Sequence, residues 1–333
     1  KRSKDMVDAV LLNDTSKRYH HGCARVSRII KNGLQKQGVD LIATSFAHKN
    51  WKKNQLFLKS LKKAQLIIIN GEGTLHSGAK SGHHLLSIVD HPLVKEKPIA
   101  LINSIWENNP DEWLELLERF SLVSVRDSNS LNNLKHSGFD KAFVVPDLSL
   151  SESLELPSSD HVGLLVGDSV KSDIRYVLAR YCQRMKATFL PTKFLANAFW
   201  NWTFPKKILW MFYNGVFTGQ IPSFKMATNE HDYAVLLSKS SGHVTGRFHG
   251  ICYSILTEVP FLAVSSVTSK IATLLVDAGV NNDRLLGKSC ILENENKVPP
   301  AFTSTELKNM RNYRALAKFQ AQKLFEQIAN LAQ

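Results

Sequence analysis

The stretch SGHVTGRFHGICYSILTEVPFLAVSS, residues 241–266, has the pattern of a strand, a turn, an apolar helix and a second strand. Its turn carries Arg247 and His249 at the point where the strand gives way to the helix. The start of a helix offers unpaired backbone N–H groups and the positive end of the helix dipole, so it favours an anion. Basic side chains at the same point strengthen that preference. We therefore expect an anion-binding turn within an α/β fold.

The same alternation of strand and helix runs along the whole chain. In the first half, apolar segments separated by helical patterns lie at 8–12, 39–46, 65–70, 98–104, 122–126 and 142–147. In the second half, the corresponding segments are HVGLLVGD, ATFLPT, GHVTG and PFLAVSS. Continuously apolar strands separated by helices indicate a parallel sheet that is covered on both faces. The sequence therefore predicts two Rossmann-like domains that face a cleft.

A chain of 333 residues is long for a single core, so two domains are expected. A Ser-rich segment that contains Pro157 separates the two runs of strands and is typical of a linker. The expected parts are an N-terminal Rossmann-like domain (1–150), a linker (151–160), a C-terminal Rossmann-like donor-binding domain (161–302) and a C-terminal helix (303–333). Thr303 and Glu306 have the spacing of a capping box at the start of that helix.

Composition and charge narrow the class of protein. Hydrophobic residues make up 44% of the chain and charged residues 21%, as in globular proteins. The net charge of +13 suggests anionic partners, although a generally basic surface would give the same number. The lysines are spread over several helical patterns instead of alternating with stacking aromatics, and no nucleic-acid motif occurs. We expect no nucleic acid among the partners.

The cysteines point to a reducing compartment. Cys23, Cys182, Cys252 and Cys290 are scattered, without a CxxC pair or a histidine cluster at ligand spacing. This spacing predicts neither a disulfide framework nor a metal site. No apolar run reaches the roughly 18–20 residues of a membrane span. We expect a cytoplasmic protein; whether an anchor or targeting segment precedes Lys1 stays open.

Polar residues follow the predicted strands in both halves of the chain. Ligands of open α/β sheets bind beyond the carboxyl ends of the strands, so these residues are site candidates. In the first half the candidates are Asn13, His21, Gly71, Glu72, Thr74, Arg126 and Asp147. In the second half they are Asp168, Arg247, His249, Ser266 and Lys270. We expect the cations Arg126, Arg247 and Lys270 to converge on the cleft.

Each of these signals has a structural alternative. The turn GEGTLHSG (71–78) lacks the GK[ST] ending of a phosphate-binding loop and is equally consistent with a tight turn. Asp127 has the position of a helix N-cap, and Asp147 that of a turn residue. A histidine beside a turn is usually a satisfied hydrogen-bonding group. The adjacent Arg247 favours a functional role for His249.

Three segments together resemble the polysaccharide pyruvyl transferase family: SVRDSNSLNNLKHSG (124–138), VVPDLSL (144–150) and VTGRFHGICYSILTEVPFLAVSSVTSKIATLLVDAG (244–279). The resemblance covers residues 8–280, with the order and spacing of the family's pattern. That pattern has a glycine-rich turn, an arginine, a strand-end aspartate, an Arg-x-His turn, a proline and a lysine. Their counterparts are NGEGTLHSG, Arg126, Asp147, Arg247-Phe248-His249, Pro260 and Lys270. Cys23 replaces an acidic residue usual in the family, and Glu72 departs from a run of glycines.

The resemblance implies a shape similar to GT-B glycosyltransferases and a defined reaction. Family members carry the pyruvyl group of phosphoenolpyruvate (PEP) onto sugar hydroxyls, usually as a ketal, so we expect PEP as co-substrate and no cofactor. The implied acceptor is a glycan or lipid-linked saccharide of exopolysaccharide or capsule synthesis. Arginine suits bidentate binding of carboxylate or phosphate, and His249 is the expected acid. The expected catalytic residues are His249, Arg247 and Arg126; the donor-binding residues are Arg126, Arg247, Phe248, His249, Lys270 and Ser266; and the acceptor or cleft residues are Asn13, His21, Gly71, Glu72, Thr74 and Asp147.

Two other function classes stay open. A GT-B glycosyltransferase that uses a nucleotide-sugar donor would also need cations at a diphosphate, but the Glu-x7-Glu arrangement of retaining enzymes has no match after Arg247. A basic binding module for an anionic polymer would account for the net charge of +13. Against this alternative, the lysines are spread over helical patterns and do not alternate with stacking aromatics.

Residues 194–219 are aromatic and basic, and the family pattern does not explain them or the wider stretch 190–230. Trp200, Trp202 and Trp210 occur there with Lys206 and Lys207. Aromatics with lysines are typical of a segment that lies on a membrane surface, which here would be the inner face of the cell membrane. An aromatic hairpin packed in the cleft or in a dimer interface is the equal alternative.

Overall fold

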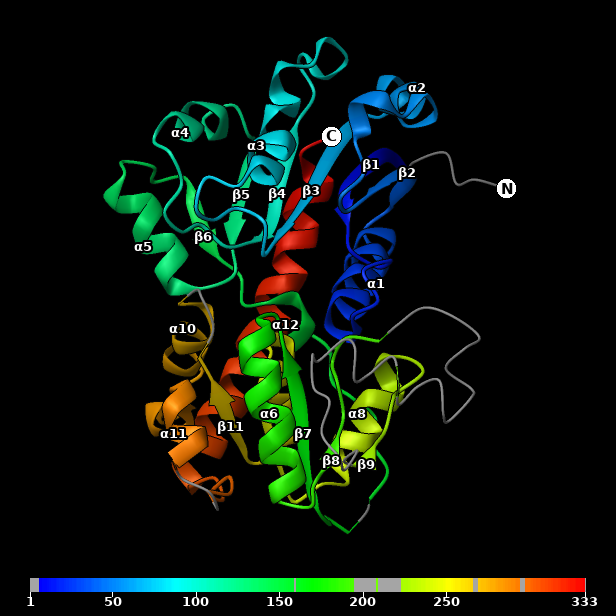
Figure 1. Ribbon diagram of the computed structural model, residues 1–333. Helices are drawn as coiled ribbons and strands as arrows, with labels where there is room; N and C mark the ends of the chain where they lie inside the picture. The colour runs from blue at the N-terminus through cyan, green and yellow to red at the C-terminus, as the bar shows by residue number, and fades with distance from the viewer. Residues whose placement is uncertain are drawn as a thin grey trace. The chain divides into compact units, whose positions relative to one another are not determined.

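The computed structural model describes residues 6–158, 160–194, 208, 223–265, 269–293 and 297–332 (Figure 1). The chain divides into two compact units, which we describe separately. Unit 1 comprises Lys1–Arg18, Val26–Glu152 and Ala315–Gln333; unit 2 comprises Tyr19–Arg25 and Ser153–Arg314. These ranges differ from the expected boundaries in three ways. The expected linker, 151–160, is divided after Glu152 instead of standing between the units. Tyr19–Arg25 belongs with unit 2, and the C-terminal helix is divided between the units instead of standing apart.

Unit 1 contains a six-stranded parallel sheet with the order β2-β1-β3-β4-β5-β6. The strands are β1 (Val7–Asp14), β2 (Val39–Phe46), β3 (Leu66–Glu72), β4 (Ile99–Ser104), β5 (Leu122–Val125) and β6 (Ala142–Val144). The order reverses between β1 and β3, which is where ligands bind in doubly wound sheets. This sheet confirms the fold class predicted from the apolar segments.

Both faces of the unit 1 sheet are buried, which explains its continuously apolar strands. Ile67 and Ile69 of β3 belong to one core, and Leu66 and Ile68 belong to the other. The first core includes residues of α2 (Gln55–Lys63), α3 (Lys80–Leu86), α4 (Glu112–Leu117) and α5 (Ser128–His136). The second includes residues of α1 (His21–Lys36) and α12 (Ser304–Asn330). Helices therefore cover the sheet on two sides.

Unit 2 contains a second six-stranded parallel sheet, with the order β12-β11-β10-β7-β8-β9. Its strands are β7 (Leu164–Ser169), β8 (Thr188–Phe189), β9 (Ser223–Phe224), β10 (Gly242–Gly246), β11 (Phe261–Val264) and β12 (Leu285–Leu286). Its helices include α6 (Ser172–Arg184), α8 (Glu230–Ser238), α9 (Phe248–Thr257), α10 (Lys270–Asp277) and α11 (Lys288–Glu293). The core between the sheet, α6 and α11 includes Val166, Val244, Leu178 and Ile291.

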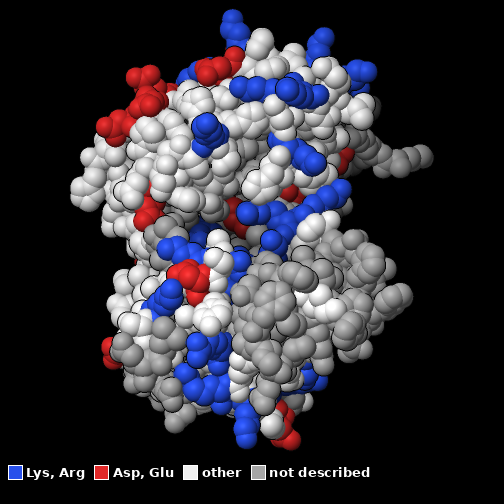
Figure 2. Space-filling model, in the orientation of Figure 1, with Lys and Arg blue, Asp and Glu red and all other residues white. Residues whose placement is uncertain are grey.

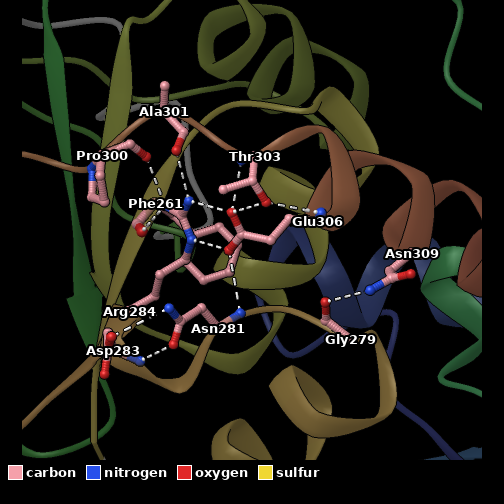
Figure 3. Close-up of polar contacts among 10 residues, drawn as sticks. All are labelled: Phe261, Gly279, Asn281, Asp283, Arg284, Pro300, Ala301, Thr303, Glu306 and Asn309. Atoms are coloured by element: carbon pink, nitrogen blue, oxygen red, sulfur yellow. Dashed lines mark hydrogen bonds and ion pairs between the residues drawn. The ribbon is translucent and has the colours of Figure 1, made fainter.

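The start of α12 is fixed by a polar network in unit 2 (Figure 3). The backbone N–H of Glu306 donates to Thr303 Oγ1 at 3.1 Å, and that of Thr303 donates to Glu306 Oε2 at 2.9 Å, which confirms the capping box. The Glu306 carboxylate also accepts from Arg284, whose Nε lies 2.8 Å from Oε1 and whose Nη2 lies 3.0 Å from Oε2. The local sequence therefore sets where this helix begins.

Two further findings concern the chain as a whole. Among the described residues, no helix combines the length and apolar character that a membrane span requires. All four cysteines lie in the described part of the chain, and no disulfide joins them.

Candidate functional site

The carboxyl ends of three neighbouring strands in unit 1 carry strained backbone. Asn13 at the end of β1, Glu72 at the end of β3 and Asn103 in β4 have φ angles of 59°, 38° and 52°. Positive φ is uncommon outside glycine, and such strain concentrates at functional sites. Asn13 Nδ2 donates to the carbonyl oxygen of Asn70 at 2.6 Å and to Thr74 Oγ1 at 3.2 Å. The structure thus brings together Asn13 and Thr74, two of the predicted cleft residues.

In the glycine-rich turn after β3, the backbone of Gly71 lies very close to the side chain of Ser104. A Cβ atom on Gly71 would lie 2.4 Å from the Cβ of Ser104 in β4, so only glycine fits there. The backbone N–H of Thr74 donates to the Gly71 carbonyl at 3.0 Å and closes the turn. This geometry accounts for Gly71 structurally, as the tight-turn alternative anticipates. A role in acceptor binding stays a prediction.

Arg126 and Asp147 form a buried ion pair in unit 1. Arg126 Nη1 lies 3.1 Å from Asp147 Oδ2, and the two side chains are 2% and 1% exposed. Asp147 Oδ1 also accepts from the backbone N–H of Ser149 at 3.0 Å. Asp127 caps α5 by accepting from the backbone N–H of Ser130 at 2.7 Å, which confirms the prediction that Asp127 is a helix N-cap. The contribution of Arg126 to donor binding stays a prediction.

In unit 2, the turn after β10 holds Arg247 against a buried carboxylate. Arg247 is the N-cap residue of α9, and its Nε and Nη2 donate to Asp168 Oδ2 at 2.9 and 2.7 Å. Asp168 lies near the end of β7, which pairs with β10, and its Oδ1 accepts from the N–H of Thr192 at 2.9 Å. These bonds fix the plane of the guanidinium group. The sequence places Asp168 at a strand end but does not reveal this pairing.

His249 is buried at the start of α9. Its ring packs edge-on against His20 and Phe248, with centroid separations of 5.3 Å in both cases. A Cβ atom on Gly22 would lie only 2.2 Å from His249 Cγ. Glycine at position 22 therefore allows the first turn of α1 to approach His249.

His21 lies inside an aromatic stack in unit 2. Its ring centroid is 4.6 Å from that of Phe194 and 5.0 Å from that of Tyr233, with nearly parallel planes. Burial lowers the pKa of His21 to about 4, although Asp168 and Asp232 act in the opposite direction. This histidine is therefore neutral near pH 7. It belongs to unit 2, whereas the other predicted acceptor residues belong to unit 1.

The remaining predicted donor residues are only partly described. Lys270 is the first residue of α10, which follows β11, and β11 is the neighbour of β10 in the sheet. Because the two strands are parallel, the turns before α9 and α10 both lie at the carboxyl ends of the strands. Ser266 lies outside the described residues. The predicted convergence of Arg126 with Arg247 and Lys270 concerns residues of two units and stays a prediction. The aromatic segment 194–219 also lies outside the described residues, apart from Phe194 and Ile208.

A cluster that the sequence analysis missed adjoins His249 in unit 2. His20, Cys23 and His249 each offer a ligand atom, and these atoms lie within 4.8 Å of one another. The expectation of no metal site rested on spacing along the chain, and that spacing cannot show residues that only the fold brings together. The nearest sequence signal is the pair of basic turns at the starts of α1 and α9.

Basic side chains are spread widely over the surface. On the face drawn in Figure 2, lysine and arginine side chains occur among acidic ones and are not confined to one element. The segment from Lys52 to Lys63 carries five exposed lysines: Lys52, Lys53, Lys59, Lys62 and Lys63. These five lysines, with no acidic residue among them, make this segment locally basic.

Comparison with solved structures defines the fold class as GT-B-like. A protein from Listeria monocytogenes assigned as a UDP-N-acetylglucosamine 2-epimerase has 8% identity and a TM-score of 0.56, covering 96% of this chain and 95% of its own. The Methanocaldococcus jannaschii UDP-GlcNAc 2-epimerase in complex with UDP-GlcNAc and UDP has 11% identity and a TM-score of 0.53, covering 92% and 99%. Anabaena HepE in complex with UDP and glucose has 12% identity and a TM-score of 0.52, covering 97% and 98%. At these identities the likeness concerns the fold alone.

The sequence itself gives the family. The profile of the polysaccharide pyruvyl transferases matches residues 21–266, so the chain belongs to that family of transferases, as its resemblance predicts. The match includes Arg126, Asp147 and the Arg247-Phe248-His249 turn. No curated protein matches the sequence.

Proposed function

We propose that this protein transfers the pyruvyl group of PEP to two hydroxyls of a saccharide and forms a cyclic ketal. The observation that carries the proposal is the turn before α9 in a member of this family. There Arg247 is oriented by Asp168, and His249 lies two residues further on, at the start of the same helix. This turn unites the groups that an anionic donor and a proton transfer require.

The donor carries a carboxylate and a phosphate, and the turn offers two means of binding them. The N-terminus of α9 presents backbone N–H groups and a positive dipole end. The guanidinium group of Arg247 adds positively charged N–H donors, whose direction is fixed by its two bonds to Asp168. Lys270, at the start of α10 on the same sheet edge, is the proposed third positive group.

His249 is the proposed general acid. It gives a proton to the methylene carbon of PEP while an acceptor hydroxyl attacks the adjacent carbon, which adds the hydroxyl across the double bond. The phosphate group then leaves, its charge stabilised by Arg247 and the helix terminus. A second hydroxyl of the saccharide attacks the same carbon. Of the two protons that the hydroxyls lose, one replaces the proton given up by His249 and the other protonates the departing phosphate. The products are a pyruvate ketal and inorganic phosphate.

The acceptor is proposed to be a glycan, free or lipid-linked, in cell-surface polysaccharide synthesis. The strand ends of unit 1 offer Asn13, Thr74 and Glu72, whose amide, hydroxyl and carboxylate groups suit sugar hydroxyls. The strained backbone at Asn13 and Glu72 supports a functional role for this edge of the sheet. Arg126 and Asp147 are proposed to support the same edge.

Thermal unfolding with added ligand tests the donor. A ligand that binds only the folded state raises the melting temperature, so PEP should stabilise the protein and UDP-N-acetylglucosamine should not. Arg247→Gln should abolish the PEP shift, because removing one partner of a desolvated charge pair costs roughly 2–5 kcal/mol. Arg180→Gln, which removes an exposed charge from α6 in the same unit, should keep it. Stabilisation by the nucleotide sugar alone would instead favour the glycosyltransferase alternative.

A further inference from the structure

We propose that His20, Cys23 and His249 form a binding site for a zinc-class divalent cation in unit 2. His20 precedes α1, Cys23 is the third residue of α1, and His249 is the second residue of α9. All three residues are buried, with exposed fractions of 9%, 5% and 6%. One ligand atom from each lies within 4.8 Å of the other two.

The donor set selects the class of metal. One thiolate and two imidazoles suit Zn²⁺ and its analogue Co²⁺, and do not suit Mg²⁺ or Ca²⁺, which prefer oxygen ligands. Zinc is known with three protein ligands and a fourth position that a water molecule or another ligand fills. Zinc bonds of about 2.0–2.3 Å place tetrahedral ligands roughly 3.3–3.8 Å apart. The ligand atoms of the three side chains lie within 4.8 Å of one another, so they have to approach by at most about 1.0–1.5 Å to coordinate one ion.

Two local interactions set the conditions for binding. His20 Nδ1 accepts from the backbone N–H of Cys23 at 3.3 Å, a long hydrogen bond. Coordination through Nε2 moves the ring proton to Nδ1 and gives up this bond. Arg247, two residues from His249, and the helix N-termini disfavour a dication. The thiolate that Cys23 would supply and the Asp168 carboxylate, which pairs with Arg247, offset part of this positive charge. Metal binding releases the thiol proton, so affinity should rise with pH.

The glycine at position 22 makes the cluster possible. It lies between His20 and Cys23 in the chain, and its missing side chain leaves the space that the His249 ring occupies. The three ligands therefore come together because the starts of α1 and α9 meet at a glycine. This contact explains why no spacing along the sequence predicts the site.

Metal binding would occupy His249, the proposed general acid. Zinc should therefore inhibit pyruvyl transfer, and a chelator should restore it. This consequence rests on the proposed function, but the binding itself does not. A spectroscopic measurement of binding keeps the two claims apart.

Titration of the metal-free, reduced full chain with Co²⁺ tests the site. Thiolate coordination should give a near-ultraviolet charge-transfer band and the visible bands of tetrahedral cobalt, and Zn²⁺ should displace them at one equivalent. Cys23→Ser should lose the charge-transfer band and weaken binding at least about 100-fold. The matched control Cys290→Ser removes the thiol of α11 in the same unit and should leave the titration unchanged.

Circular dichroism shows whether each variant is folded. His20→Gln serves as a second ligand variant, and it should keep a weakened charge-transfer band because the thiolate remains. The proposal is overturned if wild-type protein gives no charge-transfer band, or if folded Cys23→Ser gives the wild-type spectrum. Zinc inhibition without any Cys23-dependent band would also overturn it, because the metal would then bind elsewhere.

Discussion

At the scale of single residues, the two functional candidates at the turn before α9 are held in different ways. Arg247 is held by two bonds to one oxygen of Asp168, so its direction is set before any ligand binds. His249 is held by packing against His20, Phe248 and the backbone of Gly22. We infer that Arg247 binds charge and that His249 moves the proton.

His249→Gln should lower the turnover number by about 10²–10⁴-fold, because glutamine keeps a polar side chain but cannot donate a proton in the way imidazolium does. PEP affinity should fall less than in Arg247→Gln. Release of inorganic phosphate from PEP in the presence of acceptor measures the effect. The control is His231→Gln, at an exposed position of α8 in the same unit. If His249→Gln turned over at the control rate, the histidine would have only a structural role.

Asp147→Asn should destabilise unit 1 by about 3–5 kcal/mol, because it leaves the buried Arg126 guanidinium without its carboxylate. The midpoint of urea denaturation, followed by circular dichroism, measures this change. Asp140→Asn removes an exposed carboxylate from the same unit and should shift the midpoint little. Equal midpoints for the two variants would show that the ion pair does not stabilise the fold.

At the scale of secondary-structure elements, the start of α12 depends on one carboxylate. Glu306 accepts from Arg284, from the N–H of Thr303 and, at 3.2 Å, from the N–H of Asn281 (Figure 3). The hydrogen bonds from Arg284 are the main cause of a pKa lowered to about 2, and they outweigh the opposing effect of burial. The helix start is therefore stabilised by ionised Glu306.

The lowered pKa of Glu306 predicts how the free energy of unfolding depends on pH. The folded-state pKa lies below the ordinary value of 4.5, so the contribution of Glu306 is complete above 4.5 and is lost as the pH falls towards about 2. Melting temperatures of wild type and Glu306→Gln should therefore differ most at neutral pH and converge in acid. Glu326→Gln, at an exposed position of α12, should follow the wild type throughout. A constant difference between wild type and Glu306→Gln over this range would refute the assignment.

Sequence patterns predict the elements well and their pairings poorly. The apolar strands of β1 and β3 and the capping box of Thr303 are local features, because burial on both faces and helix capping are properties of short segments. The pairing of Arg247 with Asp168 depends on β10 lying beside β7, and only the folded sheet establishes that order. The positive φ of Asn13 has only a weak sequence signal, because asparagine adopts the left-handed region more often than most residues but usually does not.

At the scale of the whole molecule, two parallel six-stranded sheets place polar residues at two sets of strand ends. The fold class and the family follow from the sequence because both depend on the order of segments, which a linear pattern retains. The grouping of Tyr19–Arg25 with unit 2 does not follow, because it reflects contacts between segments far apart in the chain. The cluster of His20, Cys23 and His249 was missed for the same reason.

The most direct test of pyruvyl transfer uses PEP with ¹³C in its pyruvyl carbons and measures which product contains the ¹³C. The protein is incubated with this donor and with saccharides from the cells that make it, and the products are analysed by mass spectrometry. We expect the label to enter a saccharide as a pyruvate ketal, with one phosphate released per ketal. Both signals should form about 10²–10⁴-fold more slowly with His249→Gln. Label that stays in PEP, while a nucleotide sugar is consumed to extend the same saccharides, would contradict the account.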